Sequence, residues 1–378
     1  MNKQNSLKLI TAYQNDDIEK FRQFIKMGDN INCCNQSGDS LFEIVLSVDS
    51  KKRNKRKFIE ELIDYGAHET SNVNFNFLFE RSLFFEINDD HINKLLENNI
   101  NINSFGVVKQ FDLDGSKYAR KCSPPIFCAI ESLNKKYVDM VLKHNPDLEI
   151  CDAMNNPILN RLFQIFFSGR VPTHDIIPIL SSLIENGADP NQRDSFGNQS
   201  IHVLSDKHYM MKSFKDFETY EKLFDILCSQ NIDINSRNFR GSTPMGYATK
   251  SDNCLAIKKL IKYGASSKKD DCMFPPLFMS IIMRKKELTS IFIELNHELS
   301  YCCPYGYNII HHMAVSENTD YRSEEESYDL SYYEKILDLY PELLHKENEK
   351  KQTPIDLIKM IKKEEKKESL LNLIKKYK

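Results

Sequence analysis

The chain has 378 residues, of which 28% are charged, and its formal net charge is −3 at pH 7. This small negative charge provides no overall positive field that would favour nucleic acid or anionic lipid. No apolar run reaches the roughly 18 residues of a membrane-spanning helix, and the opening MNKQNSLKLITAYQ lacks the pattern of a secretory signal. The sequence therefore predicts a cytoplasmic chain that binds neither nucleic acid nor membrane.

Motifs that would hold a cofactor or a metal are missing from the sequence. Four of the ten cysteines form the adjacent pairs Cys33-Cys34 and Cys302-Cys303, and no C-x-x-C occurs, so zinc-ribbon and thioredoxin-like sites lack their spacing. There is also no G-x-G-x-x-G, no G-x-x-x-x-G-K-[ST] and no H-E-x-x-H. Asp112–Ser116 (DLDGS) resembles the start of a calcium loop without its closing glutamate. We predict no cofactor, no metal and no catalytic residue.

Apolar segments with helical spacing recur along the chain, and each ends at a Gly or an Asn. In chain order these closing residues are Gly28, Gly66, Asn99, Asn145, Gly187, Asn231, Gly264 and Asn296. The shortest steps between them are 32 and 33 residues. A fixed period of this size indicates a repeat architecture, in which longer steps contain insertions.

The stretch from Asn238 to Lys268 shows what one repeat does physically. Gly241 permits a tight turn, and Thr243 is placed to cap a helix that starts at Pro244. A second apolar stripe follows after a short polar break, and Gly264 ends it in a left-handed conformation. Each repeat is therefore predicted to be a turn, a helix, a short loop and a second helix. Its apolar face is too large to bury alone, so the repeats must stack.

These residues resemble the ankyrin repeat. The best matches are Gly187–Asn191 (GADPN), Asp194–His202 (DSFGNQSIH), Gly241–Pro244 (GSTP) and Thr353–Ile355 (TPI). Cys303–Ala314 and Asn35–Phe42 match more weakly, and Pro124–Ala129 and Pro275–Ser280 look like divergent starts of a first helix. The resemblance covers nearly the whole chain, and its weakest part is the third repeat, around Asn74–Asn103.

The resemblance implies an all-α solenoid of about ten helix-turn-helix units with short hairpin tips. We expect one array over residues 1–378, with first helices and tips lining a concave face. Residues from about 350 to 378 would form a capping repeat with a polar outer face. Insertions are predicted near residues 47–57, 104–122, 166–175, 205–220 and 316–331. The insertion at 104–122 falls in a tip, and the other four fall between the two helices of a repeat.

Two features of the repeats have alternative interpretations. Lys51–Lys57 (KKRNKRK) is either a solvated loop, which we favour, or a nuclear-import or phosphate-binding patch. His202 and His311 occupy the His position of the repeat motif. The resemblance implies that their rings brace the turn backbone, whereas a catalytic Cys303–His311 pair lacks any accompanying signature.

The predicted function is non-enzymatic binding of a protein partner on the concave face. Aromatic and Arg side chains are enriched in interface cores, and the sequence places several of them at adjacent tips. The candidate partner-binding residues are Ser195, Phe196, Asn198, Phe239, Arg240, Ser242, Tyr305 and Tyr307. The alternative for Phe196 and Phe239 is that they pack between neighbouring tips.

Other functional classes are weighed against this one. An enzyme or enzyme accessory would need a site in an insertion, with Ser104–Cys122 and Ser205–Tyr220 as candidates. Arrays of this composition look like those of intracellular bacteria and viruses, so a host-directed effector acting in host cytoplasm is a further hypothesis, with an intracellular scaffold as its rival. The free chain is predicted to be a monomer.

Overall fold

The fold was obtained as a computed structural model. It describes residues 3–35, 40–46, 53–66, 83, 87–98, 102–103, 105–111, 117–168, 175–206, 216–266, 276–296, 298–317 and 329–377. Of these, residues 3–7, 42–43, 98, 106–111 and 117–122 are described by their backbone alone. The described chain divides into two compact units. Unit 1 comprises Met1–Phe166 and Arg170–Asp189, and unit 2 comprises Phe167–Gly169 and Pro190–Lys378.

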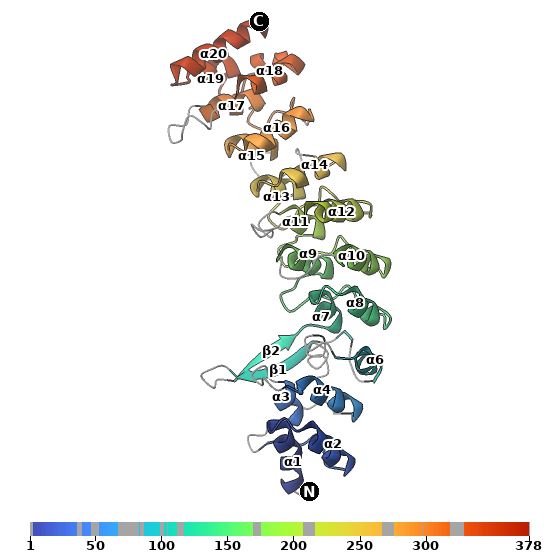
Figure 1. The fold of residues 1–378 in the computed structure, drawn as a ribbon. Helices are drawn as coiled ribbons and strands as arrows, with labels where there is room; N and C mark the ends of the chain where they lie inside the picture. Colours follow the sequence, from blue (N-terminus) through green and yellow to red (C-terminus); the bar gives the residue numbers. More distant parts are fainter. Residues whose placement is uncertain are drawn as a thin grey trace. The chain divides into compact units, whose positions relative to one another are not determined.

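Unit 1 consists of helices and one β-hairpin. Its helices are α1 (Lys3–Gln14), α2 (Ile18–Lys26), α3 (Leu41–Leu46), α4 (Lys55–Asp64), α6 (Asp89–Asn98), α7 (Pro125–Glu131), α8 (Lys135–Leu142), α9 (Ile158–Ser168) and α10 (Ile176–Glu185). The hairpin is β1 (Gly106–Phe111) and β2 (Lys117–Cys122). Figure 1 shows α7 and α9 on one side of this unit and α8 and α10 on the other. First and second helices therefore form two layers.

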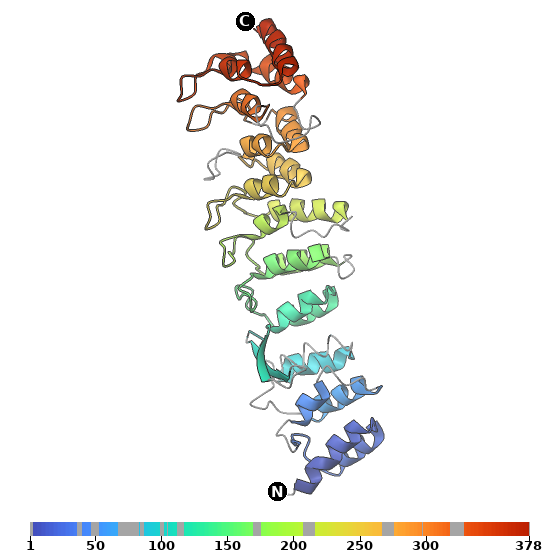
Figure 2. The same cartoon turned by 90° about the vertical axis from the view of Figure 1, so that its left-hand side faces the viewer.

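Unit 2 continues the same alternation. Its helices are α11 (Ser200–Ser205), α12 (Phe217–Cys228), α13 (Pro244–Lys250), α14 (Cys254–Lys262), α15 (Pro276–Ile282), α16 (Lys286–Glu294), α17 (Ile309–Glu317), α18 (Leu330–Leu339), η4 (Pro341–His345), α19 (Pro354–Lys359), α20 (Glu364–Ile374) and η5 (Lys375–Tyr377). First helices pack on first helices, from α11 through α13, α15 and α17 to α19. Second helices pack in the same way, from α12 through α14, α16 and α18 to α20. Figure 2 shows the loops between repeats of this unit on one side of its helices.

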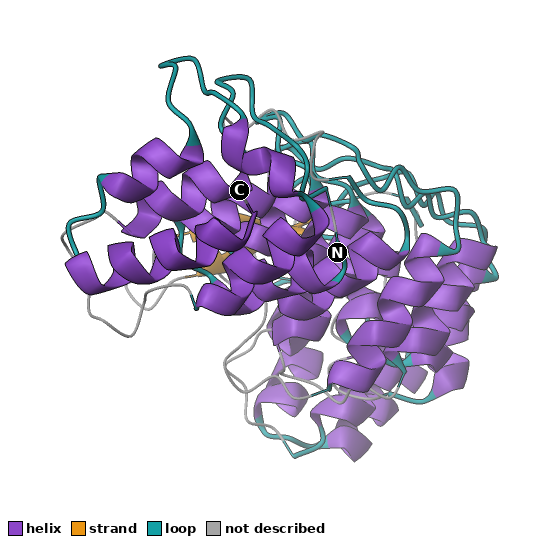
Figure 3. Ribbon diagram, turned by 90° about the horizontal axis from the view of Figure 1, so that it is seen from above, coloured by secondary structure: helices purple, strands orange, loops and turns teal. Residues whose placement is uncertain are grey.

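The predicted all-α class is confirmed, since helices dominate the described chain and its named strands are confined to one hairpin (Figure 3). The core between the layers is apolar, and Leu162, Phe163, Leu223, Phe224 and Ile310 are fully buried in it. This burial is the main stabilising term of the fold. A single helix pair could not supply it, which is why the repeats are found stacked.

The loops between repeats share one hydrogen-bonding pattern, which defines what we call a tip. In five described tips the N–H of the first residue donates to the carbonyl oxygen of the fifth, at 2.8–3.0 Å. The tips are residues 152–156, 194–198, 238–242, 303–307 and 348–352. The fourth residue of each has a positive φ, between 59° and 78°, and is Gly in three of the five. In four tips an Asp or Asn comes first, and its side chain accepts two main-chain N–H groups of its own loop.

The predicted start and stop signals of the helices are confirmed where the structure describes them. Thr243 Oγ1 accepts the N–H of Gly246 at 3.2 Å, directly before Pro244. Among the predicted closing residues, positive φ angles are found at Gly28, Gly66, Asn145, Gly187, Gly264 and Asn296. Asn231 was wrongly included, because α12 ends at Cys228 and Asn231 does not adopt this conformation. Asn99 lies outside the described residues.

The predicted insertions can be compared with the helix bounds. Within the range 104–122, strands β1 and β2 pair in antiparallel fashion, with Gly106 opposite Cys122 and Phe111 opposite Lys117. The four other ranges were too wide, because α9 ends at Ser168, and α4 begins at Lys55, α12 at Phe217 and α18 at Leu330. Helical periodicity continues into these ends, so the residues belong to the flanking helices. Within the third repeat, most residues before α6 lie outside the described part of the chain.

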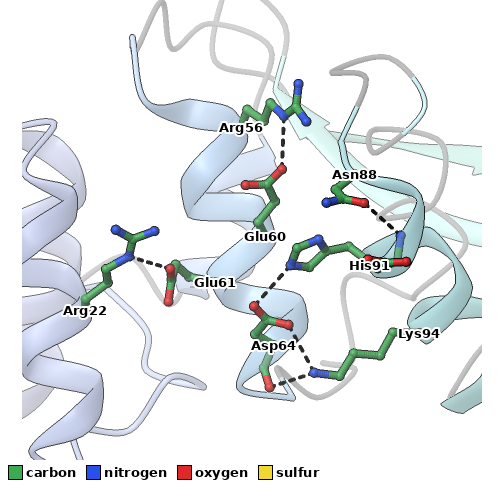
Figure 4. Close-up of polar contacts among 9 residues, drawn as sticks. Arg22, Arg56, Glu60, Glu61, Asp64, Asn88, His91 and Lys94 are labelled. Atoms are coloured by element: carbon green, nitrogen blue, oxygen red, sulfur yellow. Dashed lines mark hydrogen bonds and ion pairs between the residues drawn. The ribbon is translucent and has the colours of Figure 1, made fainter.

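Polar contacts join the outer surfaces of neighbouring second helices in unit 1 (Figure 4). Arg22 of α2 donates to Glu61 of α4 at 2.5 Å. Asp64 of α4 contacts both His91 Nε2 at 3.1 Å and Lys94 Nζ at 3.2 Å on α6. Exposed ion pairs of this kind contribute little stability individually. These contacts link each second helix to the next one, while burial of apolar side chains supplies most of the stability of the stack.

Buried histidines brace one repeat against the next. His202 Nδ1 accepts the N–H of Gln199, while Nε2 lies 3.2 Å from the carbonyl oxygen of Ser242 in the following tip. His311 repeats this geometry with Asn308 and the carbonyl oxygen of Gln352. A neutral ring protonated at Nε2 satisfies both contacts. The structural role implied by the repeat motif is therefore observed for both residues.

We expect the Gly197→Ala substitution to destabilise unit 2 strongly. At φ +78° an added Cβ would lie 2.7 Å from both the main-chain N and the ring Cδ1 of Phe239. Gly264→Ala is the matched control, because its φ is +84° and nothing lies within 4 Å of the added Cβ. The control carries only the left-handed backbone cost of about 1–2 kcal/mol, and Gly197→Ala should cost about 1–3 kcal/mol more through overpacking. Urea unfolding followed by circular dichroism measures the difference, and equal losses would contradict the tip geometry.

We expect the free energy of unfolding to fall as pH decreases from about 6.5 to about 4. Burial lowers the pKa of His202 to about 4, so below pH 6.5 the unfolded chain binds a proton that the folded chain rejects. Each such histidine costs up to about 1.4 kcal/mol per pH unit in that window. Between pH 7 and pH 5 the wild type should therefore lose about 2 kcal/mol more than His202→Asn, as measured by urea unfolding. An unchanged pH dependence in the variant would rule out the buried neutral ring.

Candidate protein-binding surface

Two exposed phenylalanines lie on adjacent tips of unit 2. Phe196 is 56% exposed and Phe239 is 72% exposed. The N–H of Phe239 donates to the carbonyl oxygen of Phe196 at 3.0 Å, so the two tips are joined through their main chains. Phe239 also lies against Gly197. Packing between tips therefore holds the main chain in place and leaves most of both rings in solvent.

Arginines accompany this aromatic pair. The guanidinium carbon of Arg240 lies 5.8 Å from the ring centroid of Phe196, within the range of a cation–π contact. Arg193 donates from Nη1 to the carbonyl oxygens of Gly197 and Arg237, at 2.8 and 2.5 Å. Arg193 thus links the two neighbouring loops through hydrogen bonds, while Arg240 lies over the exposed ring of Phe196. We call Phe196, Phe239 and Arg240 the tip cluster.

Two of the predicted contact residues are buried and belong to the scaffold. Asn198 donates to Asp194 Oδ2 and accepts from Asn238 Nδ2 of the next tip. Ser242 donates its N–H to Asn238 Oδ1, and its carbonyl oxygen contacts His202. Both residues are at most 5% exposed, so they cannot touch a partner in this conformation. Ser195 is exposed beside the tip cluster.

Tyr305 and Tyr307 lie in a different place, at the rim of a hollow of about 460 Å³. We call this feature the apolar hollow. Its lining residues come from α15, α17 and two tips, and are Ile282, Cys303, Tyr305, Tyr307, His312, Val315, Glu349 and Lys350. The sequence interpretation missed Ile282 and Val315, because an isolated apolar residue on a first helix looks like core. Both are in fact exposed.

The tips around the apolar hollow are as firmly joined as those of the tip cluster. The N–H of Glu349 donates to the carbonyl oxygen of Tyr305 at 3.1 Å. A Cβ on Gly306 would lie 2.9 Å from the Cα of Asn348, so the two tips are in close contact. The Tyr307 ring lies 5.4 Å from both the His311 and the His312 rings. Burial lowers the pKa of His312 to about 4, so this wall of the hollow is uncharged at neutral pH.

The basic run Lys51–Lys57 is only partly described, from Arg53 onward. Its described residues are not a loop of free cations. The N–H groups of Arg53 and Asn54 donate to the Asp16 carboxylate, and Lys55 is buried at the start of α4. Arg56 pairs with Glu60 at 3.0 Å (Figure 4). The favoured loop interpretation is therefore wrong for Lys55–Lys57, which are helical.

Within the described residues, no group of three or more His, Cys, Asp or Glu is arranged to hold a metal ion. None of the described helices is long and apolar enough to cross a membrane. The calcium-like residues 112–116 and most of the range 205–220 lie outside the described part of the chain.

Comparisons with known proteins agree with the repeat geometry. No family model matches the chain. Ankyrin repeat protein OPG189 of Variola virus is 24% identical over 199 residues, which is 52% of this chain and 33% of the viral protein. An ankyrin repeat protein of Acanthamoeba polyphaga mimivirus is 26% identical over 164 residues, covering 42% of this chain and 81% of its own length. The chain spans about a third of the length of the Variola relative.

Among solved structures, the ankyrin repeat domain of Bcl-3 matches with a TM-score of 0.48 and 14% identity, over 66% of this chain and 97% of that domain. The family assignment rests instead on the tips, the capped helix pairs and the histidine braces described above, together with the viral relatives. On these grounds the chain has the repeat architecture of ankyrin-repeat proteins, which its viral relatives are named as.

Proposed function

We propose that the chain is a non-enzymatic scaffold that binds a partner protein on the face formed by the tips and first helices of unit 2. The observation that carries the proposal is the tip cluster. Phe196 and Phe239 are large apolar side chains that remain in solvent although their main chains are fixed. Aromatic and Arg side chains are the commonest anchors of protein interfaces.

Rigidity supports this assignment. Binding costs free energy when side chains and loops must be ordered at the interface. Here the main-chain bond between Phe239 and Phe196, and the Arg193 contacts, order the tips before any partner arrives. The tip loops thus need little further ordering when a partner binds, which favours a binding role for the exposed rings over no role.

We further propose that the partner is a protein of a host cell, so that the chain would act in host cytoplasm as a monomer when free. The support is that the relatives with matching repeats are proteins of Variola virus and of a mimivirus. An enzymatic site in an insertion is the rival. It gains no support from the described residues, which contain no cluster suited to a metal.

We expect a triple variant, Phe196→Ser with Phe239→Ser and Arg240→Glu, to lose a partner that the wild type retains. Removing interface anchors of this kind costs at least about 2 kcal/mol, so retention should fall roughly 30-fold or more. The measurement is affinity capture from eukaryotic and bacterial cytosol, read by quantitative mass spectrometry. Circular dichroism must show that the variant keeps the wild-type fold.

Phe217→Ser is the matched control, because Phe217 is 53% exposed but begins the second helix α12. It removes a similar apolar area away from the tips and should leave capture unchanged. Equal retention by the wild type and the triple variant would contradict binding at the tip cluster. A protein lost equally from the triple variant and from Phe217→Ser would indicate non-specific apolar adhesion.

A further inference from the structure

One position of the first helices changes character along the chain. It is the sixth residue after the first residue of each helix, and it lies in the helix or, at Asp206 and Met360, one residue beyond its end. From α7 to α19 the position is occupied by Glu131, Gln164, Asp206, Lys250, Ile282, Val315 and Met360. The first four are polar or charged and the last three are apolar. Ile282, Val315 and Met360 are 43%, 41% and 57% exposed, so the change is not an extension of the core. We call these three residues the apolar ridge.

The apolar ridge and the apolar hollow form one surface of unit 2. Ile282 and Val315 belong to both, and Tyr305 and Tyr307 close the hollow on the tip side. Because α15 packs on α17 and α17 on α19, the three ridge positions follow one another across adjacent helices. The hollow's volume of about 460 Å³ is within the range of sites that enclose part of a ligand.

The length of the ridge identifies the shape of its occupant. Packed helices lie about 8–10 Å apart, so three successive helices span about 16–20 Å. An extended chain covers this distance with about five or six residues, at about 3.3 Å each. A small apolar molecule would fill the hollow and leave Met360 in water. An extended peptide segment covers both the hollow and the ridge.

The charge around the hollow indicates which residues of the bound segment would lie next to its apolar side chain. Residues 346–363, which contain the tip 348–352, α19 and the residues that flank them, carry six lysines against three carboxylates, although the whole chain has a net charge of −3. Lys350 lies in the lining of the hollow, beside Glu349. Met360 is followed closely by Lys362 and Lys363. The surface therefore becomes basic beyond the hollow and complements acidic residues in the bound segment.

We propose that the apolar hollow and ridge bind an extended segment of a partner protein, with one large apolar side chain in the hollow and acidic residues over the last repeat. This proposal rests on the proposed function, which it deepens by naming the chemistry of the partner. The binding site differs from the tip cluster. The two can therefore succeed or fail separately.

The test is selection of random twelve-residue peptides displayed on phage, with the full chain as bait and a Val315→Glu variant for counter-selection. Enriched peptides should share a large apolar residue and neighbouring Asp or Glu. Their synthetic forms should bind the wild type at least tenfold more tightly than Ile282→Glu or Val315→Glu, by fluorescence anisotropy. Binding should also weaken with added salt and in Lys350→Glu/Lys362→Glu.

Leu339→Glu is the matched control, because Leu339 is an apolar residue that is 51% exposed but ends the second helix α18. It should bind the peptides as the wild type does. The proposal is overturned if no peptide is enriched, or if Val315→Glu retains the peptides. It is also overturned if Val315→Glu acts only by dissociating a dimer of the chain. Peptides lost only from the tip-cluster variant would overturn it while supporting the proposed function.

Discussion

The hydrogen bond that closes each tip is the constraint on which the other contacts depend. It joins the first and fifth residues of the loop, and it requires a left-handed backbone at the fourth. Once the loop is closed, the Asp or Asn at its first position holds the loop's own N–H groups. At two of the five tips the preceding repeat then places a histidine ring against the fifth residue, as His202 does at Ser242 and His311 at Gln352. Local closure thus determines how one repeat meets the next.

The same closure explains why aromatic side chains can remain in solvent. The loop's polar groups are satisfied internally, so stability does not require burial of the second and third loop residues. Phe196, Phe239 and Tyr305 occupy these positions. Substitution there changes the surface without changing the loop. Gly197 is different, because its neighbour's main chain fills the space where a side chain would begin. Exposed residues and scaffold residues therefore lie next to each other within one five-residue loop.

Sequence reasoning identified the features that depend on local chemistry. Thr243, Pro244 and Gly264 carry their conformational preferences with them, so the helix starts and stops followed from composition and spacing. Asn198 and Ser242 were misplaced because neighbouring repeats take part in their burial. Asn238 of the next tip donates to Asn198, and His202 of the preceding repeat contacts the carbonyl oxygen of Ser242. Ile282 and Val315 were missed for a related reason. Their exposure depends on how α15 and α17 stack, which no single repeat contains.

Unit 2 contains both buried positions that hold the repeats together and exposed positions that do not. Stacking uses the apolar faces between the two helix layers, and these faces recur in every repeat. At one position of the first helices, Lys250 of α13 donates to the Ser242 hydroxyl of its own tip, whereas Val315 of α17 is an exposed apolar residue beside the hollow. The position is outside the apolar core in both helices, and its side chain changes from charged to apolar along the array. A sequence of such positions can give each part of the array a different partner chemistry while the fold stays the same.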